Sequence, residues 1–255
     1  MFDGLILRTA QRRSGRGGEW LNYHQYRMLK DDVGIRVIHP RYEVASNGTN
    51  SSVNPIEASA SYHWNAISNL MYEMKTGSHV YVPLREQQPL PMPEDTTTNL
   101  LPYELPDGTK VDLNRYEQLR RLPDLFFTDP IGSSSKSTKT LYDITCRNDL
   151  SIPNLVHDAI SNVDVDLRKE LCSNIVLCGA SSLHQGLEQR LSEELSNKLP
   201  KAAKCRIVCA RSVERQFASW IGASILTSLG SFQQMWISRA EYEEYGAVLA
   251  MKRCP

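Results

Sequence analysis

The sequence predicts an α/β fold in which a mixed sheet is flanked by helices. The clearest sign is a strand–helix–strand order in the last third of the chain. Residues 174–178 and 205–209 are short apolar runs, and between them leucines recur at positions 183, 187, 191, 195 and 199. Apolar residues four apart share one face of a helix, whereas short apolar runs are typical of buried strands. A parallel or mixed sheet covered by helices is therefore expected.

The first hundred residues predict a smaller, mainly helical part. Residues 20–32 are expected to form a helix, and Gly34 precedes a strand-like run at residues 35–38. Residues 45–56 are rich in Ser, Asn and Gly, which predicts a loop, and a second helix should run from about Ile56 to Lys75. The prolines of residues 83–108 exclude a long helix there, and a loop between subdomains is preferred over a polyproline surface at residues 89–93.

The C-terminal part predicts helices with clear boundaries. A helix rich in small residues is expected at about residues 213–229, and Gly230 suits the cap that follows it. Ser238 and Glu241 have the spacing of a capping box for a last short helix. Residues 133–139 are expected to be a flexible Ser- and Lys-rich stretch.

Composition narrows the class of protein. The 255 residues include 29 Lys and Arg against 29 Asp and Glu, so the bulk charge gives no argument for nucleic acid or an acidic membrane. No apolar run approaches the ~20 residues that a membrane span needs. The six cysteines form no C-x-x-C pair, which favours reduced thiols in an intracellular protein. Cys205 and Cys209 could share a strand face, but packing is preferred there over a metal site.

Physical reasoning alone selects one candidate ligand site. The small residues 179–182 lie between an expected strand and helix, where free backbone N–H groups and the helix dipole favour a phosphate or a ring. Packing is the competing explanation for these residues, and also for His184 just inside the helix. Solvated ion pairs are preferred for Asp164 and Asp166 beside Arg168, and a solvated loop for the Arg-rich residues 8–18. No catalytic triad, Walker loop or H-E-x-x-H motif is present.

Several segments resemble the actin superfamily in sequence and in order. The strongest likeness is residues 213–238, and a second specific one is the run Tyr103-Glu104-Leu105-Pro106-Asp107-Gly108. Residues 20–100 are placed mainly by order. Residues 41–46, 241–244 and 252–255 are most similar to the nuclear actin-related protein 4 class. The resemblance implies a partial actin-like fold, that is, the ribonuclease H-like ATPase architecture, with an inserted smaller helical subdomain.

The resemblance also implies a division into three parts. Residues 1–20 and 100–217 should form the larger α/β subdomain, and residues 21–99 the inserted smaller subdomain. Residues 218–255 should be C-terminal helices that belong to the opposite lobe. Because the rest of that lobe has no counterpart in this chain, the apolar faces of these helices, including Trp220 and Trp236, are expected to be partly uncovered.

The resemblance places a degenerate nucleotide face at four residues. The family's glycine pair at the adenosine site falls at Gly179 and Ala180, the aromatic residue near the base falls at His184, and the hinge lysine falls at Gln216. The match begins after the family's phosphate-binding hairpins, and phosphoryl transfer depends on such positioning. The resemblance therefore implies no catalysis, no metal and no cofactor, with ATP expected only if the preceding half is restored.

The implied function is that of a non-catalytic scaffold subunit in a nuclear chromatin-remodelling or histone acetyltransferase complex. The implied partners are actin and a helix of the scaffold subunit, with histones or the nucleosome as further contacts. No membrane and no small-molecule substrate are expected. Two alternatives stay open: an ATP-binding, actin-like protein of the cytoplasmic cytoskeleton, or an incomplete fragment of a full-length actin-related protein.

Overall fold

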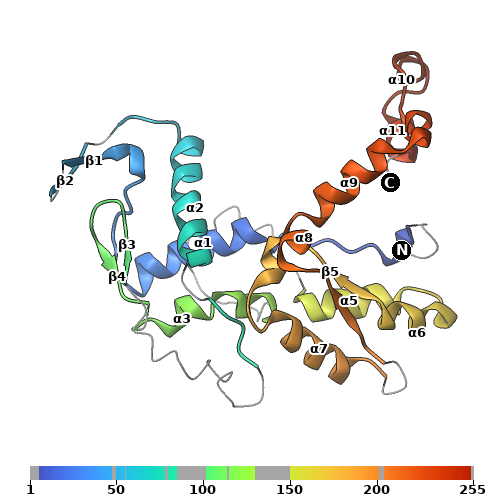
Figure 1. Ribbon diagram of the computed structural model, residues 1–255, viewed down its shortest axis with the longest axis horizontal. Coiled ribbons are helices and arrows are strands. Elements are labelled where there is room, and N and C mark those ends of the chain that lie inside the picture. The colour runs from blue at the N-terminus through green and yellow to red at the C-terminus, as the bar shows by residue number, and fades with distance from the viewer. Residues whose placement is uncertain are drawn as a thin grey trace. The chain divides into compact units, whose positions relative to one another are not determined.

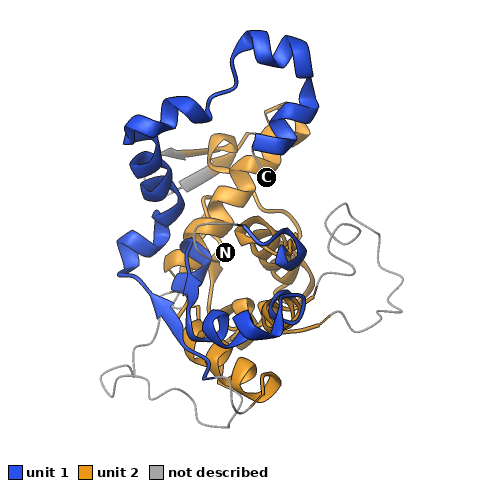
Figure 2. Ribbon diagram, turned by 90° about the vertical axis from the view of Figure 1, so that its right-hand side faces the viewer, with its two compact units in different colours: residues 1–11, 159–183, 203–255 blue, residues 12–158, 184–202 orange. Residues whose placement is uncertain are grey.

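The computed structural model describes residues 6–47, 50–54, 56–77, 80–84, 102–113, 115–129, 150–200 and 204–253. The chain separates into two compact units (Figure 2). Unit 1 comprises residues 1–11, 159–183 and 203–255, and unit 2 comprises residues 12–158 and 184–202. The stretches 89–93 and 133–139 lie outside the described residues. The expected division into three parts stays a prediction.

Two packed helices organise unit 2 (Figure 1). They are α1 (Gly18–Asp31), close to the predicted range, and α2 (Ala60–Gly77), which begins a few residues later than predicted. Aromatic rings join them, because Tyr23 and Tyr26 both meet Trp64 edge-on, with ring centroids 5.9 and 5.6 Å apart. Such edge-to-face pairs are worth about 0.5–1.5 kcal/mol each beyond the area they bury.

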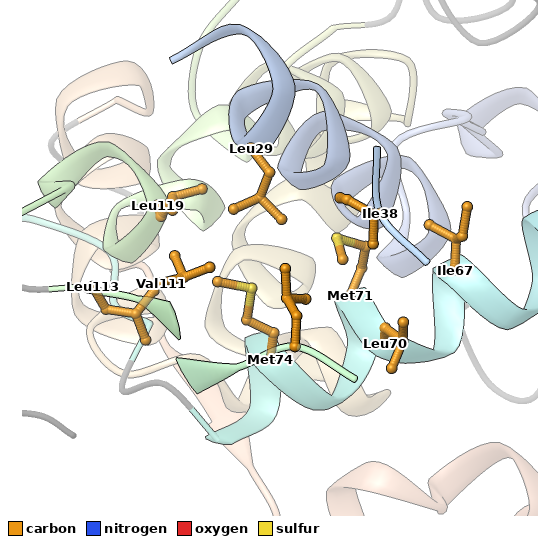
Figure 3. Close-up of a cluster of buried hydrophobic side chains, with 10 residues drawn as sticks. Leu29, Ile38, Ile67, Leu70, Met71, Met74, Val111, Leu113 and Leu119 are labelled. Atoms are coloured by element: carbon orange, nitrogen blue, oxygen red, sulfur yellow. The ribbon is translucent and has the colours of Figure 1, made fainter. Parts of the chain in front are cut away.

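The hydrophobic core of unit 2 lies where these helices meet a hairpin and a short helix. Figure 3 shows side chains converging from α1, α2, strand β4 (Lys110–Val111) and helix α3 (Glu117–Arg120). Each fully buried aliphatic side chain stabilises the fold by roughly 1.5–3 kcal/mol. The cluster consists of Leu29, Ile38, Ile67, Leu70, Met71, Met74, Leu105, Val111, Leu113 and Leu119.

The specific run at residues 103–108 is a hairpin that feeds this core. Strand β3 (Tyr103–Glu104) pairs antiparallel with β4, and Leu105 donates its N–H to the Thr109 carbonyl at 2.8 Å. The Asp107 carboxylate accepts from the Thr109 N–H at 2.9 Å, and Gly108 has a φ of +86°. The turn therefore requires glycine at this position and is stabilised by its own aspartate.

The Ser- and Asn-rich segment is a hairpin rather than the predicted loop. Strands β1 (Val44–Asn47) and β2 (Asn50–Val53) pair antiparallel with Val44 opposite Val53. Ser and Asn have little intrinsic strand preference, so the composition argued for a loop and missed the pairing. The other elements of unit 2 are η2 (Arg41–Glu43), η3 (Leu122–Phe126) and α7 (Leu187–Lys198), and α5 (Ile152–Ser161) begins in unit 2 and ends in unit 1.

The strand predicted at residues 35–38 is also wrong. These residues follow α1 as irregular backbone, and Ile38 is buried in the unit 2 core. Its apolar character therefore reflects side-chain packing rather than strand pairing. By contrast, the leucine face of α7 is confirmed, because Leu187, Leu191 and Leu195 are all buried and the helix ends before Pro200.

Unit 1 contains the parallel strands that the sequence predicted. Strand β5 (Ile175–Leu177) follows helix α6 (Val165–Ser173) and pairs parallel with β6 (Ile207–Cys209), with Ile175 opposite Ile207. Short 3-10 turns are η1 (Arg8–Ala10) and η4 (Ala180–Leu183). Among the described residues the chain thus combines helices with one parallel and two antiparallel strand pairs, which agrees with the predicted α/β class.

The C-terminal helices of unit 1 differ in detail from the prediction. The expected helix at 213–229 is interrupted at Phe217, and Gly230 opens a 3-10 turn instead of acting as a positive-φ cap. The capping box of Ser238 and Glu241 is confirmed. The elements are α8 (Ser212–Gln216), α9 (Ala218–Ser228), η5 (Gly230–Met235), α10 (Arg239–Tyr245) and α11 (Ala247–Arg253).

These C-terminal elements expose a large apolar surface. No described residue from α8 to α11 is buried, and the exposed fractions of Trp220, Trp236 and Met251 are 72%, 63% and 74%. Many exposed large apolar side chains in one segment mark an interaction site or an aggregation liability. The expectation of uncovered apolar faces is therefore confirmed. Within the described part of the chain, no helix combines the length and apolar character needed to cross a bilayer.

Asp129 accepts hydrogen bonds from residues at the start of α5, and its removal gives a first prediction. Its carboxylate accepts from Ser151 N–H at 3.0 Å and from Asn154 Nδ2 at 2.7 Å. Burial opposes ionisation, but these hydrogen bonds outweigh it and lower the pKa of Asp129. We expect Asp129→Ala to cost about 1 kcal/mol in urea unfolding at pH 7.

The same variant has a defined pH signature. A depressed carboxyl pKa stabilises the folded state above the ordinary value of about 3.9 and ceases to do so as the pH falls below it. The difference in free energy of unfolding between wild type and Asp129→Ala should therefore be smaller at pH 2.5 than at pH 7. Glu170→Gln, on the exposed side of α6, serves as the control. An equal difference in unfolding free energy at both pH values would contradict the stabilising role of the ionised Asp129 carboxylate.

The capping box of α10 gives a second prediction. Hydrogen bonds from the Ser238 backbone and side chain, and then from Arg253, lower the pKa of Glu241 to about 2. Ser238→Ala should raise the Glu241 pKa and increase amide exchange in α10, as measured by carboxyl NMR titration and hydrogen exchange. The stabilisation is present above the ordinary glutamate pKa and lost as the pH falls toward 2. Glu244→Gln on the same helix should leave both readouts unchanged.

Candidate functional site

Three of the four predicted nucleotide-face residues lie in unit 1. Gly179 lies in the turn after β5, Ala180 opens η4, and Gln216 is the last residue of α8. Turn and helix are in contact, because Gly179 donates its N–H to the Arg215 carbonyl at 2.8 Å. Gly179 has a φ of +93°, so its conformation favours glycine even though a Cβ would meet no neighbour. The structure thus brings Gly179 and Ala180 next to the helix that ends at Gln216.

The turn itself is not the start of a helix, which corrects the physical argument for a ligand site. Helix α7 begins at Leu187 after Gly186, whose φ is +82°, and residues 180–183 form a 3-10 turn. Ser182 directs both its N–H and its hydroxyl to the Gly179 carbonyl, at 3.1 and 2.7 Å. The free N–H groups and dipole of a helix N-terminus are therefore absent from residues 179–182.

Arg215 holds this turn in place, a role for which the sequence contains no chemical sign. Its Nη1 donates to the Ser182 carbonyl and its Nε to the Ala210 carbonyl, both at 3.3 Å. The side chain therefore links α8 to the turn and to the end of β6. Both acceptors lie outside α8, so the role of Arg215 depends on tertiary contacts that its place in the sequence does not indicate.

The fourth residue, His184, belongs to unit 2. Burial, and then the nearby charge of Lys75, lower the pKa of His184 to about 4, so its imidazole is neutral at pH 7. The next residue, Gln185, contacts the segment after α2, because its carbonyl accepts from the Val82 N–H at 2.8 Å. Packing, the competing explanation for His184, agrees with this burial, whereas the N-cap of α7 is Gly186 and no side chain caps the helix.

Lys75 is a buried cation that the sequence analysis did not single out. Its ammonium donates to Asn22 Oδ1 at 2.7 Å and to the Gly18 carbonyl at 3.1 Å. Burial lowers the pKa of Lys75 to about 8, while the Glu19 carboxylate opposes that shift. Because the ammonium already has two protein acceptors at the start of α1, it acts as a helix connection rather than as a free cation.

A chain of hydrogen bonds continues from Lys75 along the interface of α1 and α2. Asn22 Nδ2 donates to Ser68 Oγ at 2.9 Å, and that hydroxyl donates to Glu19 Oε2 at 2.7 Å. The other Glu19 oxygen accepts from Trp64 Nε1 at 2.8 Å. Trp64, Ser68 and Lys75 share one face of α2, and this spacing is the sequence signal that could have identified the set.

The remaining chemical candidates have structural roles. Arg12 pairs with Asp158, and Arg16 donates to the carbonyls of Leu125 and Thr128, so this loop is tied into unit 2 rather than fully solvated. Arg168 donates to two backbone carbonyls rather than to the neighbouring aspartates. In the part of the chain that the structure describes, no cluster of three His, Cys, Asp or Glu residues could hold a metal ion.

Replacing Lys75 tests this buried connection. Its lowered pKa means that the folded state loses a proton near pH 8, whereas the unfolded chain keeps it to about 10.5. Wild-type stability should therefore rise as the pH increases through that window. Lys75→Met should abolish this rise and, by leaving Asn22 and Gly18 without a donor, cost about 1–3 kcal/mol at pH 7.

The measurement is urea unfolding followed by tryptophan fluorescence at pH 7, 8, 9 and 10. Lys252→Met, at an exposed position of α11, is the control and should keep the wild-type slope. If the unfolding free energy of Lys75→Met rose with pH as steeply as that of wild type, another group would be responsible for the rise.

Comparison of the sequence with known proteins identifies the family of this chain. The actin family profile matches residues 1–255. Actin-related protein 4 of Arabidopsis thaliana is 31% identical over 260 residues, with 100% of this chain and 57% of the relative covered. Actin-related protein 4 of Oryza sativa subsp. indica is 33% identical over 267 residues, with the same coverage.

A fungal relative shows the same pattern. Actin-related protein 4 of Schizosaccharomyces pombe is 30% identical over 282 residues, with 100% of this chain and 62% of the relative covered. The chain thus spans less than two thirds of the length of these relatives. Because the family profile matches the whole chain, the protein belongs to the actin family and has a partial actin-like fold.

Proposed function

We propose that this actin-related protein is a non-catalytic subunit of a nuclear chromatin-remodelling or histone acetyltransferase complex, in which it acts as a scaffold and interaction module. The observation that carries the proposal is the match of the whole chain to proteins named Actin-related protein 4 in plants and fungi. The sequence likeness to that nuclear class extends to residues 41–46 and 241–244.

The exposed C-terminal face supports an interaction role. Apolar side chains of α9 and α11 and of the segment between α9 and α10 are exposed in unit 1, including Trp220, Leu229, Trp236 and Met251. Leaving so much apolar surface in water is unfavourable by roughly 25 cal/mol per Å², so a partner that covers it gains binding energy. We propose actin and a helix of the scaffold subunit as partners, with histones or the nucleosome as further contacts, and the nucleus as the location.

The candidate nucleotide residues support the absence of catalysis. Ala180 adds a methyl group at the turn, Gln216 replaces a cation with an amide, and His184 is neutral at pH 7. The Lys75 ammonium is bonded to Asn22 and Gly18. We propose that the chain by itself uses no ATP, metal or small-molecule substrate, and that ATP binding would require the family's preceding half.

Calorimetry with ATP tests the absence of nucleotide binding. We expect no Mg²⁺-dependent heat of ATP binding to the purified full chain up to millimolar nucleotide. Full-length actin, titrated in the same buffer, is the positive control. Micromolar, Mg²⁺-dependent binding would favour the rival, an ATP-binding cytoskeletal actin-like protein, and would overturn this part of the proposal.

Affinity purification from nuclear extract tests the interaction role. We expect the tagged full chain to recover acetyltransferase or remodelling subunits together with actin, and Trp220→Ser to reduce that recovery at least about tenfold, in line with a buried aromatic anchor. Val165→Ser is the matched control, because Val165 is also exposed in unit 1 but lies on α6.

Two outcomes would count against the proposal. Recovery of cytoskeletal proteins alone would favour the cytoskeletal alternative. Equal recovery by Trp220→Ser and wild type would remove the C-terminal face from the interaction. Sequencing the 5′ end of the transcript tests the remaining alternative, because an upstream in-frame segment with the family's phosphate-binding hairpins would identify this chain as part of a longer actin-related protein.

A further inference from the structure

An open pocket of about 450 Å³ lies between η2 and helix α2 in unit 2. Arg41 and Tyr42 line it from η2, and one face of α2 lines it from the other side. Its volume is within the range of pockets that hold ligands. None of the four candidate nucleotide residues lines this pocket, and all its lining residues belong to unit 2, whereas the exposed C-terminal helices belong to unit 1. It is therefore an additional candidate site.

The pocket is a groove that follows the axis of α2. Tyr62, Ala66, Asn69 and Glu73 line it at intervals of three or four residues, so they share one face of the helix. At a helical rise of about 1.5 Å per residue, the distance from Tyr62 to Glu73 is roughly 16 Å along the axis. Such a groove suits an extended segment better than a compact molecule.

Two contacts with η2 define the ends of the groove. At one end, the ring of Tyr42 packs on that of Tyr62 with centroids 5.1 Å apart, and the Tyr42 hydroxyl lies 2.8 Å from His63 Nδ1. At the other end, Arg41 Nη2 donates to the Glu73 carboxylate. The groove thus has an aromatic end and a charged end.

The polar groups that remain available in the groove are mainly hydrogen-bond donors. Among the described residues, the hydroxyls of Tyr62 and Tyr72 and the side-chain amide of Asn69 have no hydrogen-bond partner. Arg41 uses one nitrogen for Glu73, which leaves further N–H groups of its guanidinium available. The Glu73 carboxylate already accepts from Arg41. A ligand that offers carbonyl oxygens and few N–H groups therefore matches the groove best.

A proline-rich segment has these properties. Each proline lacks a backbone N–H, while its carbonyl remains an acceptor. The polyproline II helix is extended, with about 3.1 Å per residue, so about five residues match the length of the groove. Because this conformation is already formed before binding, little entropy is lost, and aromatic-lined grooves are a recurring way of recognising it. An acidic residue beside the prolines can also pair with the available N–H groups of Arg41.

We propose that the groove between η2 and α2 binds a proline-rich segment of a partner protein in the polyproline II conformation. Proline rings lie on Tyr42 and Tyr62, the donors of Asn69 and Tyr72 bond to peptide carbonyls, and an acidic residue of the segment pairs with Arg41. This interaction goes beyond the proposed function, because it uses unit 2 rather than the C-terminal helices of unit 1.

Fluorescence anisotropy of a labelled synthetic peptide mixed with the full chain tests the groove. The probe has the sequence EPPLPPLPE, in which an acidic residue at each end allows either direction of binding. We expect it to bind at least about tenfold more tightly than EAALAALAE, because the proline contacts are lost in the second peptide. QPPLPPLPQ should bind about threefold more weakly than the probe, as the loss of an exposed ion pair would give, and Arg41→Gln should remove that difference.

Two variants of the groove make the test specific. Ala66→Arg fills the middle of the groove and Tyr62→Ser removes its aromatic end, so each should weaken binding of EPPLPPLPE at least about tenfold. Tyr62 is exposed, so its replacement decides the question even if Ala66→Arg fails to fold.

Tyr245→Ser in α10 is the matched control, because the exposed fraction of Tyr245 is 59% and that of Tyr62 is 56%. This variant should bind the probe like wild type. Equal binding of EPPLPPLPE and EAALAALAE to wild type, or undiminished binding of the probe by Tyr62→Ser, would overturn the proposal.

Discussion

The hydrogen-bond chain from Trp64 to Lys75 is the constraint on which unit 2 depends. It places an amide, a hydroxyl and an ammonium inside the α1–α2 interface, with the exposed Glu19 carboxylate at its edge, and each group has a partner. A buried polar group without its partner costs about 1–3 kcal/mol. Shifting α2 along α1 would break several of these bonds together. These hydrogen bonds therefore determine the register of α2 on α1, and with it the packing of the neighbouring core residue Met71.

That register has consequences beyond the two helices. With Lys75 held at the start of α1, its charge and the surrounding burial keep His184 neutral. The same helix carries Tyr62, whose ring packs on Tyr42 of η2. Unit 1 follows a different principle. Its turn at Gly179 is held by Arg215, whereas its C-terminal helices expose their apolar side chains. Unit 2 is organised by a hydrogen-bond chain between its helices, and unit 1 leaves apolar side chains exposed.

Local sequence was a good guide where one segment contains all the interacting groups. The capping box of Ser238 and Glu241 and the leucine face of α7 involve neighbours within one helix, so spacing alone predicted them. The predictions failed where a distant partner decides the outcome. Residues 44–47 and 50–53 became strands through pairing, and Ile38 was buried by packing without any strand. Composition does not record either kind of contact.

The sequence by itself determined the α/β class, most helices and the likeness to the actin family, because periodicity and motif order are visible in a sequence without any knowledge of tertiary contacts. It also identified Gly179, Ala180, His184 and Gln216 as candidates. Only the tertiary structure decided that α7 begins at Leu187. It alone showed the burial of Lys75 and the groove between η2 and α2. Burial and charge compensation depend on residues far apart in the chain, and folding brings those residues together.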